Sequence, residues 1–342
     1  MKAAIVGLGR IGSLLEEDPL REKPCTHAGA IRAEADCVLA AGADTDGERR
    51  RLFGKRWGCP VYADAETMLR ETSPDILHIA THPDSHGYYC ALAAACHVPV
   101  AVCEKPLADT LGRARKIAAL HRSGKIKIIT NHERRYAADY RQARTILKEG
   151  RLGRVLGVNA RLCMGKTRRL LDVLWHDGTH LADALMFLSG CRLRHKKAWG
   201  SPLSRGTGTA FLLGFLYGLG SVSKSPAPAK AGDSFQGDIP FLFEVGAERD
   251  HLVFELEFSC SQGRLRIGNG LFEVWESIPS PYAEGFRSLT KTETAFTGPT
   301  GYFANMVKDA VRCVRDSAHE PRSGAADGLE VIRYLKSIRA WT

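Results

Sequence analysis

Residues 175–183, WHDGTHLAD, place two histidines and two aspartates within about two helical turns. On a regular helix, His176 and Asp177 would each share a face with His180. Three kinds of site are compatible with this spacing: an acid–base pair, a zinc site, or a solvated helix face. In the zinc site, His176 and His180 would chelate the metal, with Asp177 or Asp183 as a third ligand. We favour proton transfer by His180, because the intervening glycine loosens the helix and no cysteine lies close in sequence.

A glycine-rich turn near the start of the chain has the spacing of a dinucleotide-binding loop. The sequence GLGRIG, residues 7–12, directly follows an apolar, strand-like run. In this pattern Gly7 makes the tight turn, Gly9 lets a pyrophosphate approach the backbone, and Gly12 lets the next helix pack against the strand. The sequence therefore predicts a helix that begins at this turn and presents its N–H groups to a pyrophosphate.

An acid at the end of the second predicted strand would bind a ribose hydroxyl of the dinucleotide. Asp44 ends the apolar run 37–43. A carboxylate there disfavours the 2′-phosphate of NADP, so we predict NAD, while Arg49 and Arg50 leave NADP possible. Asp44 and Asp46 could instead cap a helix, which is compatible with ribose binding. Asp44 lies further from the glycines than usual, and we attribute the excess to an inserted polar loop, residues 16–25.

The distribution of apolar residues predicts two domains. Short apolar runs alternate with amphipathic stretches in the first third, which is typical of a parallel sheet covered by helices. Later strand-like runs, separated by Gly-rich turns, indicate a mainly antiparallel sheet. These runs are residues 155–162, 211–216, 241–245, 251–258 and 264–268. We therefore predict an α/β Rossmann domain in residues 1–130 and an α+β domain with an open sheet in residues 131–342. Residues 221–238, rich in Pro, Gly and Ala, are predicted to form a loop.

Composition excludes several classes of protein. The chain has 342 residues, of which 44% are hydrophobic and 25% charged, as in ordinary globular proteins. The net charge of +10 is carried by dispersed arginines, so we expect no nucleic-acid partner and a modest preference for anionic ligands. We expect no membrane span, because long apolar runs are lacking. Ten scattered cysteines without a CxxC pair and the lack of a secretory signal predict a cytoplasmic protein with reduced thiols.

Further motifs make a family recognisable. ATHPDSH (80–86), CEKPLA (103–108) and DGTHLAD (177–183) follow the glycine-rich turn in this order. The ordered set resembles the glucose–fructose oxidoreductase/inositol dehydrogenase family, known as Gfo/Idh/MocA. The resemblance implies a Rossmann domain that holds NAD(H) or NADP(H), and a second domain whose open sheet serves as substrate platform and often as oligomer interface. It also implies hydride transfer between nicotinamide and a secondary hydroxyl or keto group of a sugar, sugar derivative or cyclitol.

The resemblance also implies roles for single residues. Lys105 would reach the substrate hydroxyl and the nicotinamide ribose and Pro106 would be cis, while His180 would be the general acid/base. Many family members have an Asp four residues before this His; here His176 occupies that place and Asp177 follows, so either could be the catalytic partner. We therefore do not transfer the polyol specificity of inositol dehydrogenases. Besides Gly7 and Lys105, the cofactor contacts would be Gly9, Arg10, Ile11, Gly12, Asp44, Thr81, His82, His86 and Glu104.

Substrate contacts are expected from residues that precede the HDGTH motif. Arg134 or Arg135 could bind an anionic group in bidentate fashion, and Arg168 and Arg169 could add to this. Trp175 could stack on a sugar ring or belong to the core. We predict a carbohydrate-type, in some cases anionic, substrate and a homodimer or homotetramer formed through the exposed sheet face. Two alternatives are a hydrolase or lyase that oxidises its substrate transiently with bound NAD, and a non-catalytic nucleotide sensor.

Overall fold

The computed structural model describes residues 1–165, 168–204, 206–218, 235 and 237–339. The chain forms two compact units: unit 1 consists of Met1–Ala138 and Pro299–Ile332, and unit 2 of Asp139–Gly298 and Arg333–Thr342. Residues 299–332 thus belong to unit 1, although the sequence-based division assigned every residue after 130 to the second domain. The physical reason is helix α9 (Tyr302–Arg315), whose buried side chains join the core around β1 and α1.

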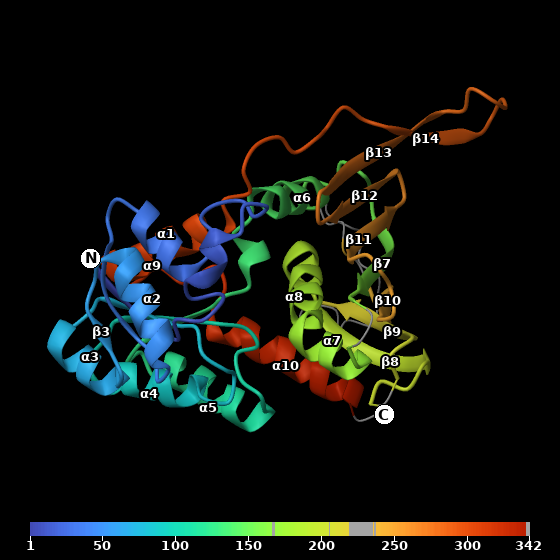
Figure 1. Ribbon diagram of the computed structural model, residues 1–342. Coiled ribbons are helices and arrows are strands. Elements are labelled where there is room, and N and C mark those ends of the chain that lie inside the picture. The colour runs from blue at the N-terminus through green and yellow to red at the C-terminus, as the bar shows by residue number, and fades with distance from the viewer. Residues whose placement is uncertain (166–167, 205, 219–234, 236, 340–342) are drawn as a thin grey trace. The chain divides into compact units, whose positions relative to one another are not determined.

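Unit 1, which contains the helices labelled α1 to α5 in Figure 1, is built on a parallel sheet with the strand order β3-β2-β1-β4-β5-β6. The strands are mostly apolar because helices cover both faces of the sheet; every residue of β4 and β5 is buried, including His78 in β4. The order reverses between β1 and β4, which is the arrangement of a dinucleotide-binding Rossmann fold, so the predicted α/β class is confirmed. The strands are β1 (Lys2–Val6), β2 (Val38–Ala43), β3 (Val61–Tyr62), β4 (Ile76–Ile79), β5 (Val100–Cys103) and β6 (Lys127–Thr130); the helices are α1 (His27–Ala33), α2 (Gly47–Trp57), α3 (Ala65–Thr72), α4 (His86–Ala95) and α5 (Leu111–Arg122).

The helix that we predicted to begin at the glycine-rich turn is interrupted after one turn. The N–H of Ser13 donates to the carbonyl of Gly9 (3.0 Å), and the chain then leaves the helix axis through a short 3-10 helix, η1 (Leu14–Glu17). Helix α1 resumes the same path, because the N–H of His27 donates to the carbonyl of Ile11 (3.1 Å). The inserted segment, residues 14–26, therefore lies inside the first helix, and its presence explains why Asp44 is so far from the glycines.

Unit 2 contains a second sheet in the order β14-β13-β12-β11-β7-β10-β9-β8, antiparallel except for the parallel pair β7 and β10. This confirms the predicted mainly antiparallel sheet, although β8, β13 and β14 were missed because their sequences are polar or short. The predicted loop 221–238 lies outside the described residues except for 235, 237 and 238. The strands are β7 (Val155–Cys163), β8 (Arg192–Gly200), β9 (Thr209–Tyr217), β10 (Ile239–Gly246), β11 (Val253–Cys260), β12 (Gly263–Gly268), β13 (Leu271–Pro279) and β14 (Arg287–Lys291); the helices are α6 (Ala138–Lys148), α7 (Leu170–His176), α8 (Gly178–Ser189) and α10 (Ala325–Arg339), which begins in unit 1.

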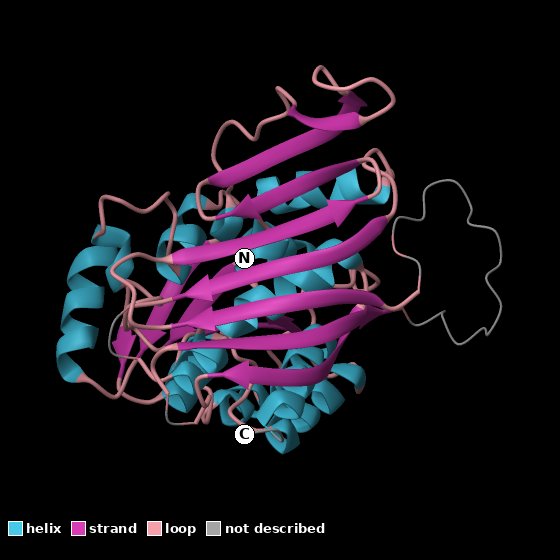
Figure 2. Ribbon diagram, turned by 90° about the vertical axis from the view of Figure 1, so that its right-hand side faces the viewer, coloured by secondary structure: helices cyan, strands magenta, loops and turns pink. Residues whose placement is uncertain are grey.

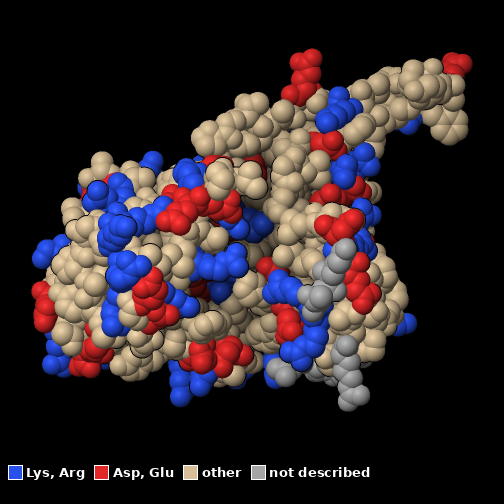
Figure 3. Space-filling model, viewed as in Figure 1, with Lys and Arg blue, Asp and Glu red and all other residues tan. Residues whose placement is uncertain are grey.

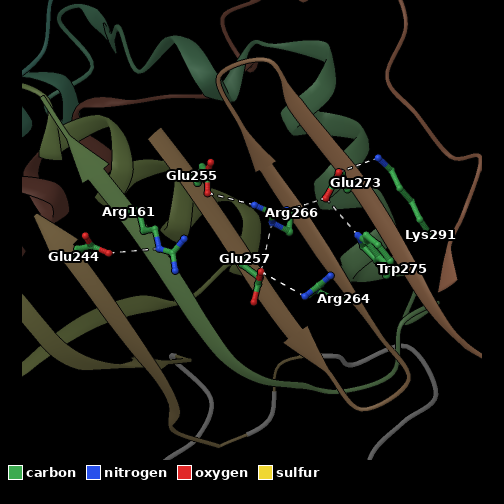
Figure 4. A network of polar contacts seen from close by, with 9 residues as sticks. All are labelled: Arg161, Glu244, Glu255, Glu257, Arg264, Arg266, Glu273, Trp275 and Lys291. Carbon is green, nitrogen blue, oxygen red and sulfur yellow. Dashed lines mark hydrogen bonds and ion pairs between the residues drawn. The ribbon is translucent and has the colours of Figure 1, made fainter. Parts of the chain in front are cut away.

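The two faces of this second sheet, seen face-on in Figure 2, differ in polarity. On one face Phe241 and Phe243 are buried and pack edge-on against Tyr334 of α10. The other face carries a network of alternating charges (Figure 4). At its centre, the guanidinium of Arg266 lies 3.4 Å from Glu257 and 3.0 Å from Glu273. The sheet is therefore apolar toward its own helices and charged on the opposite side.

All ten cysteines are free thiols, and six of them are buried. Burial raises the pKa of Cys260 to about 12, so this thiol stays protonated at neutral pH. None of the helices in the described part of the chain is both long and apolar enough to cross a membrane.

Candidate active site

The glycine-rich turn after β1 needs glycine at two of its three positions for reasons internal to the fold. Gly7 has a φ of +91°, and a Cβ atom added there would lie 2.5 Å from the carbonyl oxygen of Ala80. At Gly12 an added Cβ would lie 2.1 Å from the carbonyl oxygen of Gly7. At Gly9 the nearest atom would be the guanidinium of Arg49, 3.6 Å away. The space over Gly9 is therefore open to a ligand.

The same turn presents unpaired backbone donors. Within the residues that the structure describes, no acceptor takes the backbone N–H groups of residues 9–12. These are the first four amides of the helical turn, which an α-helix cannot satisfy internally. Their partial positive charges favour an anion. The open space and the free donors together fit the pyrophosphate of a dinucleotide.

Asp44 lies beside this turn and is held by two backbone amides. Its Oδ2 accepts from the N–H of Leu8 (2.8 Å) and its Oδ1 from the N–H of Asp46 (2.9 Å). Asp46, and not Asp44, caps α2 by accepting from the first amides of that helix. The Arg49 guanidinium lies 3.6 Å from Asp44 Oδ2. The Asp44 carboxylate is thus fixed next to the glycine-rich turn with lone pairs left for a ribose hydroxyl.

The segment after β4 brings predicted cofactor contacts to the same edge of the sheet. The hydroxyls of Thr81 and Ser85 are 2.7 Å apart, and His82 is exposed. His86 is buried, with its two ring nitrogens 3.1 Å from the carbonyl of Thr81 and 3.3 Å from that of Leu107. Burial lowers the pKa of His86, which is therefore neutral at physiological pH. His86 holds the loop between β4 and α4 in place and is not itself exposed.

Glu104 and Lys105 follow β5, and the peptide bond between Lys105 and Pro106 is cis, as the resemblance implied. Glu104 is buried, and its Oε1 accepts from the amide of Asn131 (2.6 Å) and contacts His27 Nε2 (3.0 Å). Burial by itself raises the pKa of Glu104. The hydrogen bond and charge of His27, the ammonium of Lys105 and the amide of Asn131 outweigh it, so the pKa lies below its ordinary value. The carboxylate is therefore ionised at neutral pH.

The sequence reasoning missed His27, His78 and Asn131 as members of this cluster. Asn131 directly follows the last parallel strand, a position that could have marked it as facing the cofactor edge. A histidine in the middle of the buried strand β4 was the available signal for His78. His27 could not have been assigned, because residues 14–26 separate it from the glycine-rich turn whose helix it continues.

In unit 2 the HDGTH motif does not lie on one regular helix, contrary to our expectation. Helix α7 ends at His176, Asp177 forms the joint, and α8 begins at Gly178. Asp177 Oδ1 lies 3.1 Å from His176 Nδ1, and Asp177 Oδ2 accepts from Arg168 (2.7 Å). His176 is exposed, whereas Asp177 and His180 are half-buried. The structure thus joins His176 and Asp177 to each other, with Arg168 as a third member.

In the described ranges, no three His, Cys, Asp or Glu side chains are placed to hold a metal ion. Asp183, a possible third ligand, is buried in α8.

The predicted substrate arginines differ in their surroundings. Arg135 is buried, and its guanidinium lies 2.9 Å from Asp327 Oδ1 and 3.3 Å from the carbonyl of Arg322. It ties the segment after β6 to the start of α10 within unit 1. Arg134 contacts the neighbouring Glu133 (3.2 Å), and Trp175 is half-buried in α7. Basic and acidic side chains are interspersed on the face that Figure 3 shows, as the dispersed arginines predicted.

Residues 1–132 match a family model described as an oxidoreductase family with an NAD-binding Rossmann fold. These residues belong to the Gfo/Idh/MocA family. The match confirms the predicted family for residues 1–132, which lie in unit 1.

Named relatives match part of the chain. The D-apiose dehydrogenase of Paraburkholderia graminis is 33% identical over 129 residues, which are 37% of this chain and 34% of that protein. The D-glucoside 3-dehydrogenase of Escherichia coli (strain K12) is 26% identical over 205 residues, 56% of this chain and 54% of that protein. The chain therefore spans only about a third to a half of these relatives.

The solved structure of aldose–aldose oxidoreductase from Caulobacter crescentus, complexed with glycerol, covers 100% of this chain and 97% of its own chain. Its TM-score is 0.75 at 16% sequence identity, so the two chains share a fold.

Proposed function

We propose that the protein is an oxidoreductase that transfers a hydride between a nicotinamide dinucleotide and a secondary hydroxyl or keto group of a sugar, sugar derivative or cyclitol. The observation that carries the proposal is the open turn at Gly9 with the free backbone amides of residues 9–12, next to the fixed carboxylate of Asp44. The relatives named for D-apiose and D-glucoside oxidation support the substrate class. The acid at Asp44 favours NAD over NADP.

The proposed division of labour follows the chemistry of alcohol oxidation. NAD⁺ supplies the hydride acceptor when it is bound. The Lys105 ammonium stabilises the negative charge that develops on the substrate oxygen, an electrostatic role. The imidazole of His180 takes up the hydroxyl proton, because its ordinary pKa lies near neutral pH. Asp177, oriented by Arg168 and next to His176, supports the histidine or contacts the substrate. Arg134 and Trp175 remain the proposed substrate contacts.

The test is NADH formation, followed by absorbance, with a panel of D-glucosides, D-apiose and inositols. We expect Lys105→Met and His180→Asn each to lower kcat/KM by roughly 10²-fold or more. The exposed Lys116→Met, on α5 of the same unit, is the matched control and should leave kcat/KM unchanged. Binding of NAD⁺ without NADH formation from any panel member would overturn the proposal. Consumption of a glycoside without net NADH would indicate a hydrolase or lyase that regenerates its cofactor.

We further propose that the charged face of the sheet in unit 2 joins two copies of the chain, giving a homodimer or homotetramer in the cytoplasm. Alternating Arg and Glu side chains make this face self-complementary, and the free thiols suit a reducing compartment. Sedimentation of wild type and of Arg266→Glu tests this. Arg266 lies among Glu255, Glu257 and Glu273, so the variant gathers like charges and should shift the mass toward the monomer. An unchanged oligomer would argue against this face.

A further inference from the structure

Three titratable side chains form a buried chain of contacts behind Lys105. His78 on β4 and His27 on α1 are fully buried, and Glu104 is 6% exposed. The Nδ1 atoms of His27 and His78 are 2.8 Å apart, and His27 Nε2 lies 3.0 Å from Glu104 Oε1. The chain of hydrogen bonds thus runs from the middle of the parallel sheet to the residue before Lys105.

The direction of these hydrogen bonds follows from the chemistry of the groups. An ionised carboxylate only accepts, so His27 Nε2 carries a proton and donates to Glu104. His78 is neutral, because burial and the neighbouring charge of His27 lower its pKa. Between the two Nδ1 atoms one ring donates and the other accepts, whether His27 is neutral or charged. In either case His78 fixes the ring of His27, and His27 fixes Glu104.

The groups around the chain hold it in one arrangement. The Phe303 ring of α9 packs edge-on against His27, with centroids 5.3 Å apart. Asn131, after β6, donates to the same Glu104 oxygen as His27, and the backbone N–H of Lys105 donates to the other oxygen (3.2 Å). Among the described residues, His86 on α4 and the buried Cys103 have pKa values that the charge of Glu104 affects. The ammonium of Lys105 and the hydrogen bonds from His27 and Asn131 favour the ionised form of this carboxylate.

This chain of hydrogen bonds costs more free energy than an apolar core would, if its only role is packing. His78 Nε2 is buried, and no residue in the described part of the chain accepts from it or donates to it. Burying a polar group without a partner costs free energy that an apolar side chain of similar size would avoid. A role of His27 and His78 at Glu104, the residue before Lys105, would account for this cost.

We propose that His27 and His78 are positioning residues, which fix the Glu104 carboxylate as an anion in one orientation beside Lys105. This inference rests on the proposed function for the role of Lys105. The Glu104 anion then holds the ammonium of Lys105 in place for the substrate oxygen. Because Asn131 alone cannot replace the donor of His27, loss of His27 lets burial raise the pKa of Glu104. The carboxylate then protonates at a higher pH, so the lower step of the acid limb, below the step set by the general base His180, moves upward.

The experiment compares His27→Leu, His27→Gln and His78→Leu with wild type. The readouts are the pH dependence of kcat/KM and the titration of the ¹³C-labelled Glu104 carboxyl, assigned with Glu104→Gln. We expect His27→Leu to move both midpoints upward by about one pH unit, the loss of one charge-assisted hydrogen bond. His27→Gln, whose amide can still donate, should recover most of the shift, and His78→Leu should show a smaller one.

His121→Leu is the matched control, because His121 on α5 and Glu320 form another His–Glu pair in unit 1, 3.7 Å apart. It should lower the melting temperature without moving the acid limb. A fall in melting temperature of the His27 variants with both midpoints unchanged would overturn the proposal. If His27→Leu does not fold, His27→Gln and His78→Leu decide by the same readouts. If wild type lacks dehydrogenase activity, the proposed function fails, while the ¹³C titration still tests whether His27 and His78 keep Glu104 ionised.

Discussion

The glycine-rich turn allows the fold and the cofactor site to be tested separately with two substitutions three residues apart. At Gly12 an added methyl group would lie 2.1 Å from a backbone oxygen, far inside van der Waals contact, so the backbone must shift. Overpacking of this kind costs about 1–3 kcal/mol, and we expect Gly12→Ala to lower the free energy of unfolding by at least this much. At Gly9 the nearest atom would be 3.6 Å away, at the end of a flexible side chain.

Gly9→Ala should therefore leave the fold intact and damage only dinucleotide binding. Its φ lies outside the left-handed region, so alanine is tolerated and could even add about 0.4–1 kcal/mol of stability through the unfolded state. The methyl group would occupy the space proposed for the pyrophosphate. If that overpacking costs about 1–3 kcal/mol, the affinity for NAD⁺ falls by roughly 5- to 150-fold.

The assay is urea unfolding of both variants without ligand, followed by NAD⁺ titration of Gly9→Ala by calorimetry. A fixed NAD⁺ concentration of a hundred times the wild-type Kd adds about 2.7 kcal/mol to the free energy of unfolding of wild type. With a tenfold weaker Kd, the same concentration adds only about 1.4 kcal/mol. Wild-type affinity in Gly9→Ala, or a loss of stability equal to that of Gly12→Ala, would refute this account of the turn.

Other substitutions test the choice of cofactor, the core of unit 2 and the role of Arg135. Asp44→Asn should narrow the preference for NAD over NADP by about tenfold, because the charge that repels the 2′-phosphate is lost. Calorimetry with both dinucleotides measures the ratio of their dissociation constants. An unchanged ratio would contradict the proposed contact between Asp44 and the ribose. Phe241→Ala should lower the free energy of unfolding by about 3–5 kcal/mol, while the exposed Leu156→Ala changes it by less than about 0.5 kcal/mol in the same urea titration. Arg135→Met should lower the melting temperature, because the ion pair with Asp327 is lost, and should leave the KM for the substrate unchanged. A raised KM at unchanged melting temperature would instead indicate that Arg135 binds the substrate.

Much of the architecture could be predicted because it depends on local patterns. Continuous apolar runs predicted the parallel strands, period-two alternation predicted β7, and strand-like runs between Gly-rich turns predicted β9, β10, β11 and β12. These patterns are local because burial on one or two faces of a strand depends on neighbouring residues. The edge strand β14 and its neighbour β13 were not predicted, because few of their side chains are buried and the hydrophobic pattern is weak. The break between α7 and α8 at Asp177 also escaped, because two helices joined by one helical residue have almost the sequence pattern of one.

By itself, the sequence determined the spacing of the glycine-rich turn, the acid after β2 and the order of the family motifs, because each depends on residues adjacent in the chain. Only the tertiary structure decided which polar groups meet. Residues 27, 78 and 104 come together because the strand order puts β4 between β1 and β5, while α1 continues past a 13-residue insertion, residues 14–26. Likewise, α9 packs into the core of unit 1, and Arg135 forms an ion pair with Asp327. Contacts between residues far apart in the chain depend on how the elements pack, and no local pattern records that packing.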